Sequence, residues 1–489
     1  MNRRWRAGHL PGVDTADVRW HGLRFAAHGR EVEIEVPVLS EPQMQALARH
    51  VRGSAQTVLA AMPVDAIVGV LDRAVARLLD PADPLRREAD ELLPVVTGLD
   101  AEMVALGLTA YLQTFRAPQL HRFVAQDFAN PKVLDGFQPA VKGGAVRAFG
   151  PRLLGHSWAG NVPGLPLWSL ACGLLVKAGS VGKLPSAEPV FASLLARLLA
   201  QIHPPLADCL AIVWWPGEQP EPAAGLWREA DTVLAYGGNA ALRGIRDQLP
   251  VTTRFLGYGH KLGLALVGRA ALDPLRGPAA ARAAALDLVR YEQQGCYSPH
   301  VLYVERGGAL DPRGFAQHLA TELAGLAHRH PRRELSLEDA ASVAAWRQAA
   351  EWRALSGAGD ELLGDGQSTW AVAFSGQARP LAPSAGHRCV QVCAVDALDD
   401  VLPLLRGHEP FLQTVGLATT PAELYRLAGL LGAAGVTRVA ALGAMTQPEA
   451  GWHHDGRFNL ADLVRMVDIE PSAELAADRL APYAQEGRP

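Results

Sequence analysis

Between residues 150 and 264, apolar runs of strand length alternate with helix-like segments, and this alternation restricts the fold more than any other feature of the sequence. Residues 209–215 and 232–236 are short apolar runs, and residues 240–248 have the composition of a helix. Strands that alternate with helices favour a parallel sheet whose faces are covered by those helices. The sequence therefore predicts an α/β fold.

The second of these predicted strands ends in Gly237, Gly238 and Asn239, a turn that leads into the predicted helix. A helix N-terminus presents free N–H groups and the positive end of the helix dipole, which suit a phosphate group. A strand, a glycine turn and a helix occur in very many α/β domains, however, and residues 257–262 do not form a Gly-x-Gly-x-x-Gly motif. The turn alone therefore gives only a weak indication of a dinucleotide.

Cys296 lies in a polar turn between a predicted helix at residues 279–290 and a predicted strand at residues 300–305. Gly295 offers a helix stop, and Pro299 prevents the helix from continuing. Functional side chains are commonly mounted at such junctions, and a cysteine thiolate is a strong nucleophile. The alternative is a small buried thiol without chemistry. The other cysteines all lie in apolar segments: Cys172, Cys209, Cys389 and Cys393.

Composition and charge exclude several classes of protein. The formal net charge is −4 and the basic residues are scattered, so no nucleic-acid partner is expected. Five cysteines without a Cys-x-x-Cys pair suggest neither a disulfide framework nor a zinc ribbon, and they fit a reducing cytoplasm. The longest apolar run, residues 162–176, is shorter than the ~20 residues of a membrane span, and the N-terminus lacks an apolar signal segment. We expect a cytoplasmic protein without a membrane span.

His453, His454 and Asp455 are the one group that could suggest a metal site near the C-terminus. Adjacent side chains diverge in direction, and no further ligand lies at a useful spacing. We therefore predict no metal and expect a turn at this position.

Three separated motifs occur in an order that is typical of one enzyme family. They are His-Ser-Trp-Ala-Gly-Asn-Val-Pro at residues 156–163, Gln-Gly-Cys-Tyr-Ser-Pro-His at residues 294–300 and Trp-His-His-Asp-Gly-Arg at residues 452–457. A Gly-Lys-x-Pro-Ser turn, residues 182–186, follows the first motif. Together they resemble the LuxC-like long-chain fatty acyl-CoA reductases of bacterial bioluminescence, a branch of the aldehyde dehydrogenase superfamily. The resemblance covers roughly residues 153–470.

This resemblance implies an aldehyde dehydrogenase-like architecture, with a nucleotide-binding parallel-sheet domain and an α/β catalytic domain. A length of 489 residues also suggests two or three domains. We predict that residues 1–264 hold N-terminal helices and strands and the nicotinamide nucleotide-binding domain. Residues 265–470 then form the catalytic domain with the cysteine nucleophile, and residues 471–489 form a C-terminal tail. Within the catalytic part, residues 360–366 are expected to be a loop and residues 436–442 a buried strand.

The resemblance also implies roles for individual residues. Cys296 would carry the acyl group, and Asn161 with the Cys296 backbone N–H would stabilise the oxyanion. Lys183 would contact the adenosine ribose or its 2′-phosphate, and the glycine turn Gly237, Gly238 and Asn239 would lie at the cofactor. The alternatives are a turn residue for Asn161 and a solvated surface lysine for Lys183. Lys177 is less favoured as a cofactor contact because it closes a helix, while His454 or Arg457 is expected near the substrate mouth.

The implied reaction is reduction of a fatty acyl thioester to a fatty aldehyde with hydride from NADPH, or alternatively NADH. Arg243 and Arg246, together with Lys183, offer cations for the 2′-phosphate that distinguishes NADPH. The implied partners are the acyl thioester, donated by coenzyme A or through an acyl-protein synthetase, and further copies of the chain in a homo-oligomer. We keep a cysteine-dependent acyltransferase without redox activity, and a non-catalytic docking protein, as alternatives.

Two departures from the wider superfamily affect this interpretation. Gly257 stands where hydrolytic aldehyde dehydrogenases carry a water-activating glutamate, so the acyl-enzyme is expected to persist until it is reduced. His260 is a candidate substitute base. No glutamate near residues 387–389 matches the one that grips the nicotinamide ribose elsewhere. For Cys296 itself, we expect local dipoles to lower the thiol pKa by about one unit from its ordinary ~8.5.

Overall fold

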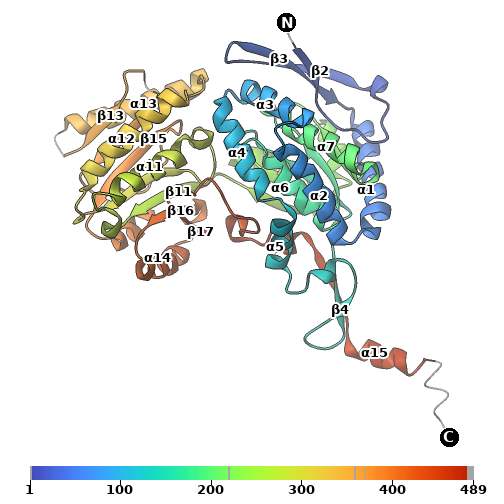
Figure 1. Ribbon diagram of the computed structural model, residues 1–489. Helices are drawn as coiled ribbons and strands as arrows, with labels where there is room; N and C mark the ends of the chain where they lie inside the picture. The colour runs from blue at the N-terminus through green and yellow to red at the C-terminus, as the bar shows by residue number, and fades with distance from the viewer. Residues whose placement is uncertain (1–2, 218–220, 357–358, 368, 482–489) are drawn as a thin grey trace.

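Two separate sheets organise the protein in the computed structural model (Figure 1), which describes residues 3–217, 221–356, 359–367 and 369–481. The first sheet has the order β10-β9-β6-β7-β8, and all of its neighbouring strands run parallel. Its strands are β6 (Leu153–Ser157), β7 (Gly179–Lys183), β8 (Leu210–Val213), β9 (Thr232–Tyr236) and β10 (Arg254–Tyr258). The predicted parallel sheet is confirmed.

The second sheet has the order β13-β14-β15-β12-β11-β16-β17 and is parallel except for the β13–β14 pair. Its strands are β11 (Leu262–Val267), β12 (Pro299–Glu305), β13 (Glu361–Gly364), β14 (Ala371–Ser375), β15 (Cys389–Val395), β16 (Leu412–Ala418) and β17 (Arg438–Ala441). Two expectations are wrong here. Residues 360–366 contain the edge strand β13, and β17 is a half-exposed edge strand and not a buried one.

Helices cover both faces of both sheets. Those that precede or belong to the first sheet are α1 (Glu41–Ala61), α2 (Val64–Leu79), α3 (Pro84–Thr97), α4 (Ala101–Gln113), α5 (Ala117–Asp127), α6 (Leu165–Leu175), α7 (Phe191–Ile202), α8 (Pro204–Ala207), α9 (Glu221–Trp227) and α10 (Asn239–Arg246). Those of the second sheet are α11 (Arg276–Val289), α12 (Pro312–Arg329), α13 (Leu337–Leu355) and α14 (Pro421–Ala433), and α15 (Pro471–Asp478) ends the described chain. No helix in the described ranges is long and apolar enough to cross a membrane.

The alternation of side chains along each strand explains the layers. In the first sheet, Leu153 and Val181 pack with α1 and α9, whereas Leu154 and Leu210 face α2, α6 and α7. In the second sheet, α11 and α12 cover one face and α14 lies over the other. Both faces of each sheet are thus buried, as parallel sheets require.

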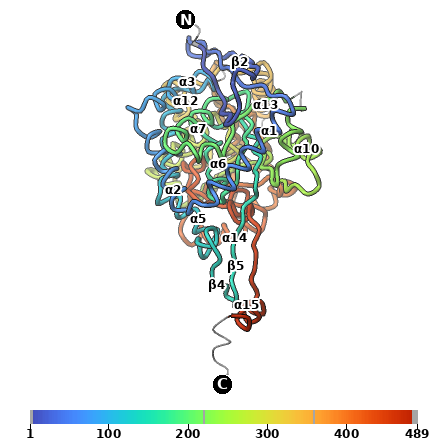
Figure 2. The backbone as a smooth tube through the Cα atoms, turned by 90° about the vertical axis from the view of Figure 1, so that its right-hand side faces the viewer, coloured from blue at the N-terminus to red at the C-terminus, as the bar shows by residue number. Residues whose placement is uncertain are grey.

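Two small sheets flank this body. β1 (Arg3–Arg6), β3 (Arg30–Val38) and β2 (Arg19–Ala27) form the first, and alternate side chains of β3, those of Val32, Ile34 and Val36, are buried. β18 (Arg465–Ile469), β5 (Ala145–Phe149) and β4 (Gln138–Pro139) form the second. Figure 2 shows that β4, β5 and α15 extend away from the rest of the molecule.

The predicted domain limits do not coincide with the sheets. The boundary between residues 264 and 265 falls inside β11, which belongs to the second sheet. Near the other limit, Leu460 and Leu463 are buried in the core that contains α4, α5 and α6, and the backbone N–H of Ala461 donates to Asp127 at 3.0 Å. The chain therefore returns to the first half of the molecule before residue 470.

Candidate active site

Cys296 follows a short 3₁₀ turn, Arg290–Gln293, and precedes β12. Tyr291, Glu292 and Gln293 have φ angles of 52°, 54° and 62°, so three consecutive residues with side chains adopt the left-handed conformation. Each such residue is disfavoured, and strain of this kind persists only where the surroundings hold it. The predicted junction is confirmed, and its backbone is strained.

A fully buried ion pair holds the strained turn. Arg388 Nε and Nη2 donate to the two carboxylate oxygens of Glu292 at 3.0 and 2.7 Å, and the side chains are 1% and 2% exposed. The backbone N–H of His387 donates to Glu292 O at 3.1 Å, and His387 and Arg388 are themselves left-handed, with φ of 51° and 67°. Gln293 Nε2 donates to Pro299 O at 2.6 Å and to Cys389 O at 3.0 Å. The cysteine turn is thereby locked onto β12 and β15.

Cys296 opens into a cavity of about 490 Å³ between the two sheets, which we call the cysteine cavity. Its wall includes a cluster of rings. His454 lies 4.5 Å from Tyr258 and 4.7 Å from Trp452 between ring centroids, and Trp168 meets His454 edge-on at 5.1 Å. Burial lowers the pKa of His454 to about 4, so this imidazole is neutral at physiological pH. The cavity suits an apolar ligand with one reactive polar end.

Asn161 is brought to Cys296 as predicted. Both residues line the cysteine cavity, and Asn161 Nδ2 donates to Gln294 O at 2.7 Å, two residues before the cysteine. An amide nitrogen carries two N–H groups, so one remains for a second acceptor. Gly237 and Gly238 also line this cavity, after the end of β9.

The expectation for the thiol pKa is wrong. The pKa of Cys296 is raised to about 11. Burial is the main cause and the negative charge of Asp455 adds to it, while a hydrogen bond from Gln413 Nε2 to Sγ, at 3.4 Å, opposes them only in part. Desolvation disfavours the charged form of a thiol, and here it outweighs the local dipoles. The resting site therefore holds a thiol.

Gln413 and Asp455 are site residues that the sequence did not identify. Gln413 Nε2 also donates to Asp455 Oδ1 at 2.6 Å, and Lys261 Nζ lies 3.7 Å from Asp455 Oδ2. Asp455 has a φ of 54°, and it is the only carboxylate among the described residues that line the cysteine cavity. Gln413 stands in the buried strand β16 and has no sequence signal of its own. Asp455 lies in the Trp-His-His-Asp motif, which was the available clue.

Two further histidines line the cysteine cavity. The backbone N–H of Ser384 donates to His300 Nδ1 at 3.1 Å, which leaves the proton of a neutral ring on Nε2. Burial lowers the pKa of His300 to about 4, and the charge of His260 lowers it as well. His260 itself is exposed in the cavity wall, where its role as a substitute base stays a prediction.

The structure corrects the expectation for Gly257. A Cβ atom on Gly257 would meet Phe255 at 2.9 Å and Leu242 at 3.5 Å, so a side chain there would point into a second cavity beside α10. Side chains alternate along a strand, and it is the next residue, Tyr258, that faces the cysteine cavity. Burial raises the pKa of the Tyr258 phenol, so it stays protonated and is no base. Tyr258, the β10 residue that faces the cysteine cavity, is thus not a carboxylate, so the expected lack of a water-activating glutamate on this strand still applies.

The remaining predicted residues lie apart from the cysteine cavity. The second cavity, of about 780 Å³, is lined by Asn239, Arg243, Arg246, Gly257 and Arg457. Of the two candidates for the substrate mouth, His454 thus lines the cysteine cavity and Arg457 does not.

Lys183 ends β7 and is half-buried, with Nζ 5.4 Å from the Trp215 ring centroid, and burial lowers its pKa. It is therefore not the solvated surface lysine of the alternative interpretation. Lys177 Nζ is paired with Asp135 at 2.8 Å.

The residues present fit a nicotinamide nucleotide at the carboxyl edge of the first sheet. Lys183, Gly237 and Tyr258 stand at or just beyond the carboxyl ends of three parallel strands, where α/β sheets bind such ligands. Within the described chain, Lys183 has no carboxylate partner that would neutralise it. A Cβ atom on Gly238 would meet nothing within 4 Å, so the turn leaves open space before α10.

Comparisons with known proteins agree with this geometry. The sequence matches the family described as Acyl-CoA reductase (LuxC) over residues 59–466. It is 26% identical over 373 residues to a long-chain acyl-protein thioester reductase of Photorhabdus luminescens, covering 76% of this chain and 74% of the relative. A relative of the same description from Aliivibrio fischeri is 26% identical over 357 residues, with 72% and 70% covered.

Solved structures share the fold. An oxidoreductase from Marinobacter aquaeolei aligns with a TM-score of 0.74 at 15% identity, covering 95% of this chain and 98% of the other. Aldehyde dehydrogenase 21 from Physcomitrella patens aligns with a TM-score of 0.71 at 13% identity, covering 96% and 98%. The aldehyde dehydrogenase-like fold and the family resemblance predicted from the sequence are both confirmed.

Proposed function

This chain belongs to the acyl-CoA reductase (LuxC) family, and we propose that it reduces a fatty acyl thioester to a fatty aldehyde through an acyl group carried on Cys296. One observation carries the proposal. Cys296 and Asn161 face one apolar cavity, and the Asn161 amide is hydrogen-bonded into the cysteine turn. A nucleophile and a fixed N–H donor that face the same cavity are what acyl transfer requires.

The acyl transfer follows from these groups. The Cys296 sulfur, after losing its proton to solvent, attacks the thioester carbonyl, and the free N–H of Asn161 and the Cys296 backbone N–H stabilise the oxyanion. The carrier sulfur takes up one proton as it leaves, so the exchange consumes no net proton. The bond from the carbonyl carbon to the carrier sulfur then breaks, and the carrier leaves as a thiol. The step exchanges one thioester for another, so its free-energy change is close to zero and a small fraction of thiolate is sufficient for the reaction to proceed.

A nicotinamide nucleotide, when bound, supplies the hydride that reduces the acyl group. Gly237 and Gly238 would hold its nicotinamide end near Cys296, and Lys183 would hold the adenosine ribose or its 2′-phosphate. We propose NADPH as the preferred nucleotide, with NADH as the alternative, and acyl-CoA as the donor, with an acylated protein as the alternative. We further propose that the protein acts in the cytoplasm, that an acyl-protein synthetase is its partner and that it forms a homo-oligomer.

Aldehyde, and not fatty acid, is the proposed product because no free carboxylate among the described residues lines the cysteine cavity. Asp455 is already bonded to Gln413 and close to Lys261, and Tyr258 occupies the place on β10 that faces the cysteine. General-base assistance is typically worth about 10²–10⁴-fold, so hydrolysis of the acyl-enzyme is slow without it.

The test is to incubate the protein with saturated acyl-CoA esters of graded length and NADPH or NADH. Consumption of nucleotide and formation of aldehyde are expected, and intact mass without nucleotide should show one acyl adduct that is absent from Cys296→Ala. An adduct without nucleotide consumption would favour the acyltransferase. No adduct at all would favour the docking protein and refute the proposal.

A further inference from the structure

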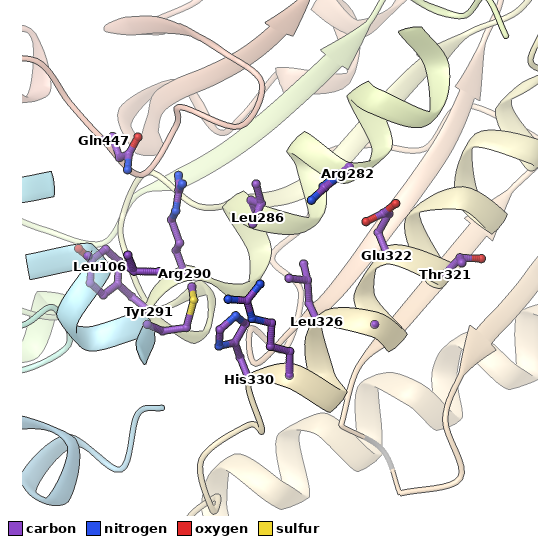
Figure 3. A pocket seen from close by; sticks show the side chains of 14 residues that line it. Leu106, Arg282, Leu286, Arg290, Tyr291, Thr321, Glu322, Leu326, His330 and Gln447 are labelled. Carbon is purple, nitrogen blue, oxygen red and sulfur yellow. The ribbon is translucent and has the colours of Figure 1, made fainter. Parts of the chain in front are cut away.

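We propose that a cationic pocket beside the cysteine cavity binds the phosphate-bearing carrier of the acyl thioester, namely coenzyme A or another phosphopantetheine. This inference rests on the proposed function and names the substrate class more closely. The outer pocket has a volume of about 520 Å³ and lies between α4, α11 and α12 (Figure 3).

The outer pocket adjoins the cysteine cavity. Gly107, Tyr291 and Gln447 line both. Gly107 on α4 lacks a side chain where the Tyr291 ring comes closest, because a Cβ atom there would lie 2.8 Å from the phenol oxygen. Tyr291 belongs to the strained turn that carries Cys296, so the wall between the two spaces is fixed by the same backbone as the nucleophile.

Three arginines and one glutamate line the outer pocket, and the nearby Asp287 carboxylate offsets the charge of Arg290 in part. Arg290 donates only to neutral oxygens, Gly443 O at 2.9 Å and Thr446 Oγ1 at 3.3 Å, and Arg282 has no carboxylate partner in the described ranges. The two arginines are eight residues apart near one helix, about 12 Å along its axis from the rise of an α-helix. Arg329, in contrast, is already paired with Glu102.

Between these cations the floor is apolar. Leu286 and Leu326 lie between Arg290 and the outer end of the pocket, and Arg282 on α11 and Glu322 on α12 border that end (Figure 3). Guanidinium groups bind phosphate through paired hydrogen bonds, and a pantetheine chain has apolar segments that suit the leucines. Glu322 is the one carboxylate among the described lining residues, and it opposes an anionic ligand.

A thioester with this placement uses both spaces. The proposal requires its carbonyl to reach Cys296 in the cysteine cavity and its carrier to run along the shared residues Gly107, Tyr291 and Gln447, so that the phosphates lie near Arg282 and Arg290. The nucleotide enters from the other side, at Gly237 and Gly238, so carrier and nucleotide do not compete for the same cations.

The test compares three donors with one acyl chain: acyl-CoA, acyl-4′-phosphopantetheine and acyl-pantetheine, which has no phosphate. Arg282→Gln should raise KM for acyl-CoA by roughly three- to fivefold, as expected for a partly exposed charge contact, and leave KM for acyl-pantetheine unchanged. Glu322→Gln should change KM for acyl-CoA in the opposite direction. Arg276→Gln is the matched control, because Arg276 lies on the same helix outside the pocket and pairs with Asp273.

The outcomes separate this inference from the proposed function. If no donor is reduced by the unmodified protein, the proposed function fails and this inference fails with it. If all three are reduced but Arg282→Gln and Glu322→Gln act equally on acyl-pantetheine, or on none, the function stands and the pocket assignment is overturned. An effect on both phosphorylated donors places the pantetheine phosphate at Arg282, and an effect on acyl-CoA alone places the nucleotide phosphates there. Calorimetric titration of free coenzyme A into Arg282→Gln, which needs no turnover, should show the same weakening.

Discussion

The cysteine turn and the glycine turn face one cavity, but they are built in opposite ways. Residues 291–293 are left-handed and are held by the buried pair of Glu292 and Arg388, whereas Gly237–Asn239 leads into α10 without a strained residue or a buried ion pair. Backbone strain is retained at functional sites only when packing over-determines it. The difference indicates that the cysteine turn is fixed before any ligand arrives, while the glycine turn, which we propose holds the nucleotide, is not held by strain or by a buried ion pair.

The largest expected effect breaks the fixed side. Arg388→Met leaves Glu292 as an unpaired buried carboxylate and should lower the free energy of unfolding by about 3–5 kcal/mol. The double variant Glu292→Gln/Arg388→Met should recover part of this loss. Urea unfolding followed by tryptophan fluorescence measures both.

Arg152 provides an exposed control in the first sheet, at the amino ends of β6 and β9. Its ion pair with Asp231, at 2.7 Å, is 61% and 29% exposed, so Arg152→Met should cost less than about 1 kcal/mol. Similar losses for Arg152→Met and Arg388→Met would mean that the cysteine turn is not specially held, and the contrast between the two turns would disappear.

The second expected effect distinguishes chemistry from binding. Asn161→Ala removes one oxyanion donor and should lower kcat by about 10²-fold or more, with little change in the KM of the nucleotide. Asn239→Ala, at the start of α10 outside the cysteine cavity, should act on the KM of the nucleotide and spare kcat. Steady-state kinetics with one acyl-CoA decide the matter, and the reverse pattern would place Asn161 among the nucleotide contacts.

The third expected effect concerns the open side alone. Lys183 is half-buried and unpaired with any carboxylate of the described chain, so it can bind a 2′-phosphate at a small desolvation cost. Lys183→Ala should raise KM for NADPH about tenfold, the worth of one charge-assisted hydrogen bond, and change KM for NADH much less. Equal changes with both nucleotides would assign Lys183 to the ribose or to the fold.

The sequence predicted the reaction centre better than its electrostatics. The family resemblance paired Cys296 with Asn161, because each stands in one of the motifs that carry it, and both residues line the cysteine cavity. The pKa of Cys296 depends instead on burial by rings from distant segments and on Gln413 and Asp455, which are 42 residues apart and meet only in the fold. Desolvation has no local sequence signal.

The same limit explains the errors in the fold. The apolar run at residues 232–236 located β9 correctly, because a strand that is buried on both faces is apolar throughout. β13 was missed because an edge strand next to loop residues has no such pattern, and its pairing with β14 is settled by tertiary contact. The side of β10 that Gly257 faces was not predicted either, because in a strand one position reverses the side that a residue faces.

The smallest expected effect tests how the fixed side controls its nucleophile. Gln413 bridges Sγ and Asp455, at 3.4 and 2.6 Å. The carboxylate charge is therefore close enough to make ionisation of the thiol less favourable by about 1 kcal/mol, which lowers the fraction of thiolate about fivefold. Asp455→Asn keeps the shape of the side chain and tolerates the left-handed backbone.

Because the pKa of Cys296 is about 11, the rate of iodoacetamide alkylation of the unmodified protein should rise about tenfold per pH unit between pH 7 and 10. At pH 8, Asp455→Asn should be alkylated about fivefold faster, since less negative charge opposes the thiolate. Asp462→Asn, in the same segment but outside the cavity, should leave the rate unchanged. Slower alkylation of Asp455→Asn would show instead that Asp455 accepts the thiol proton, and the site would then contain the base that its geometry argues against.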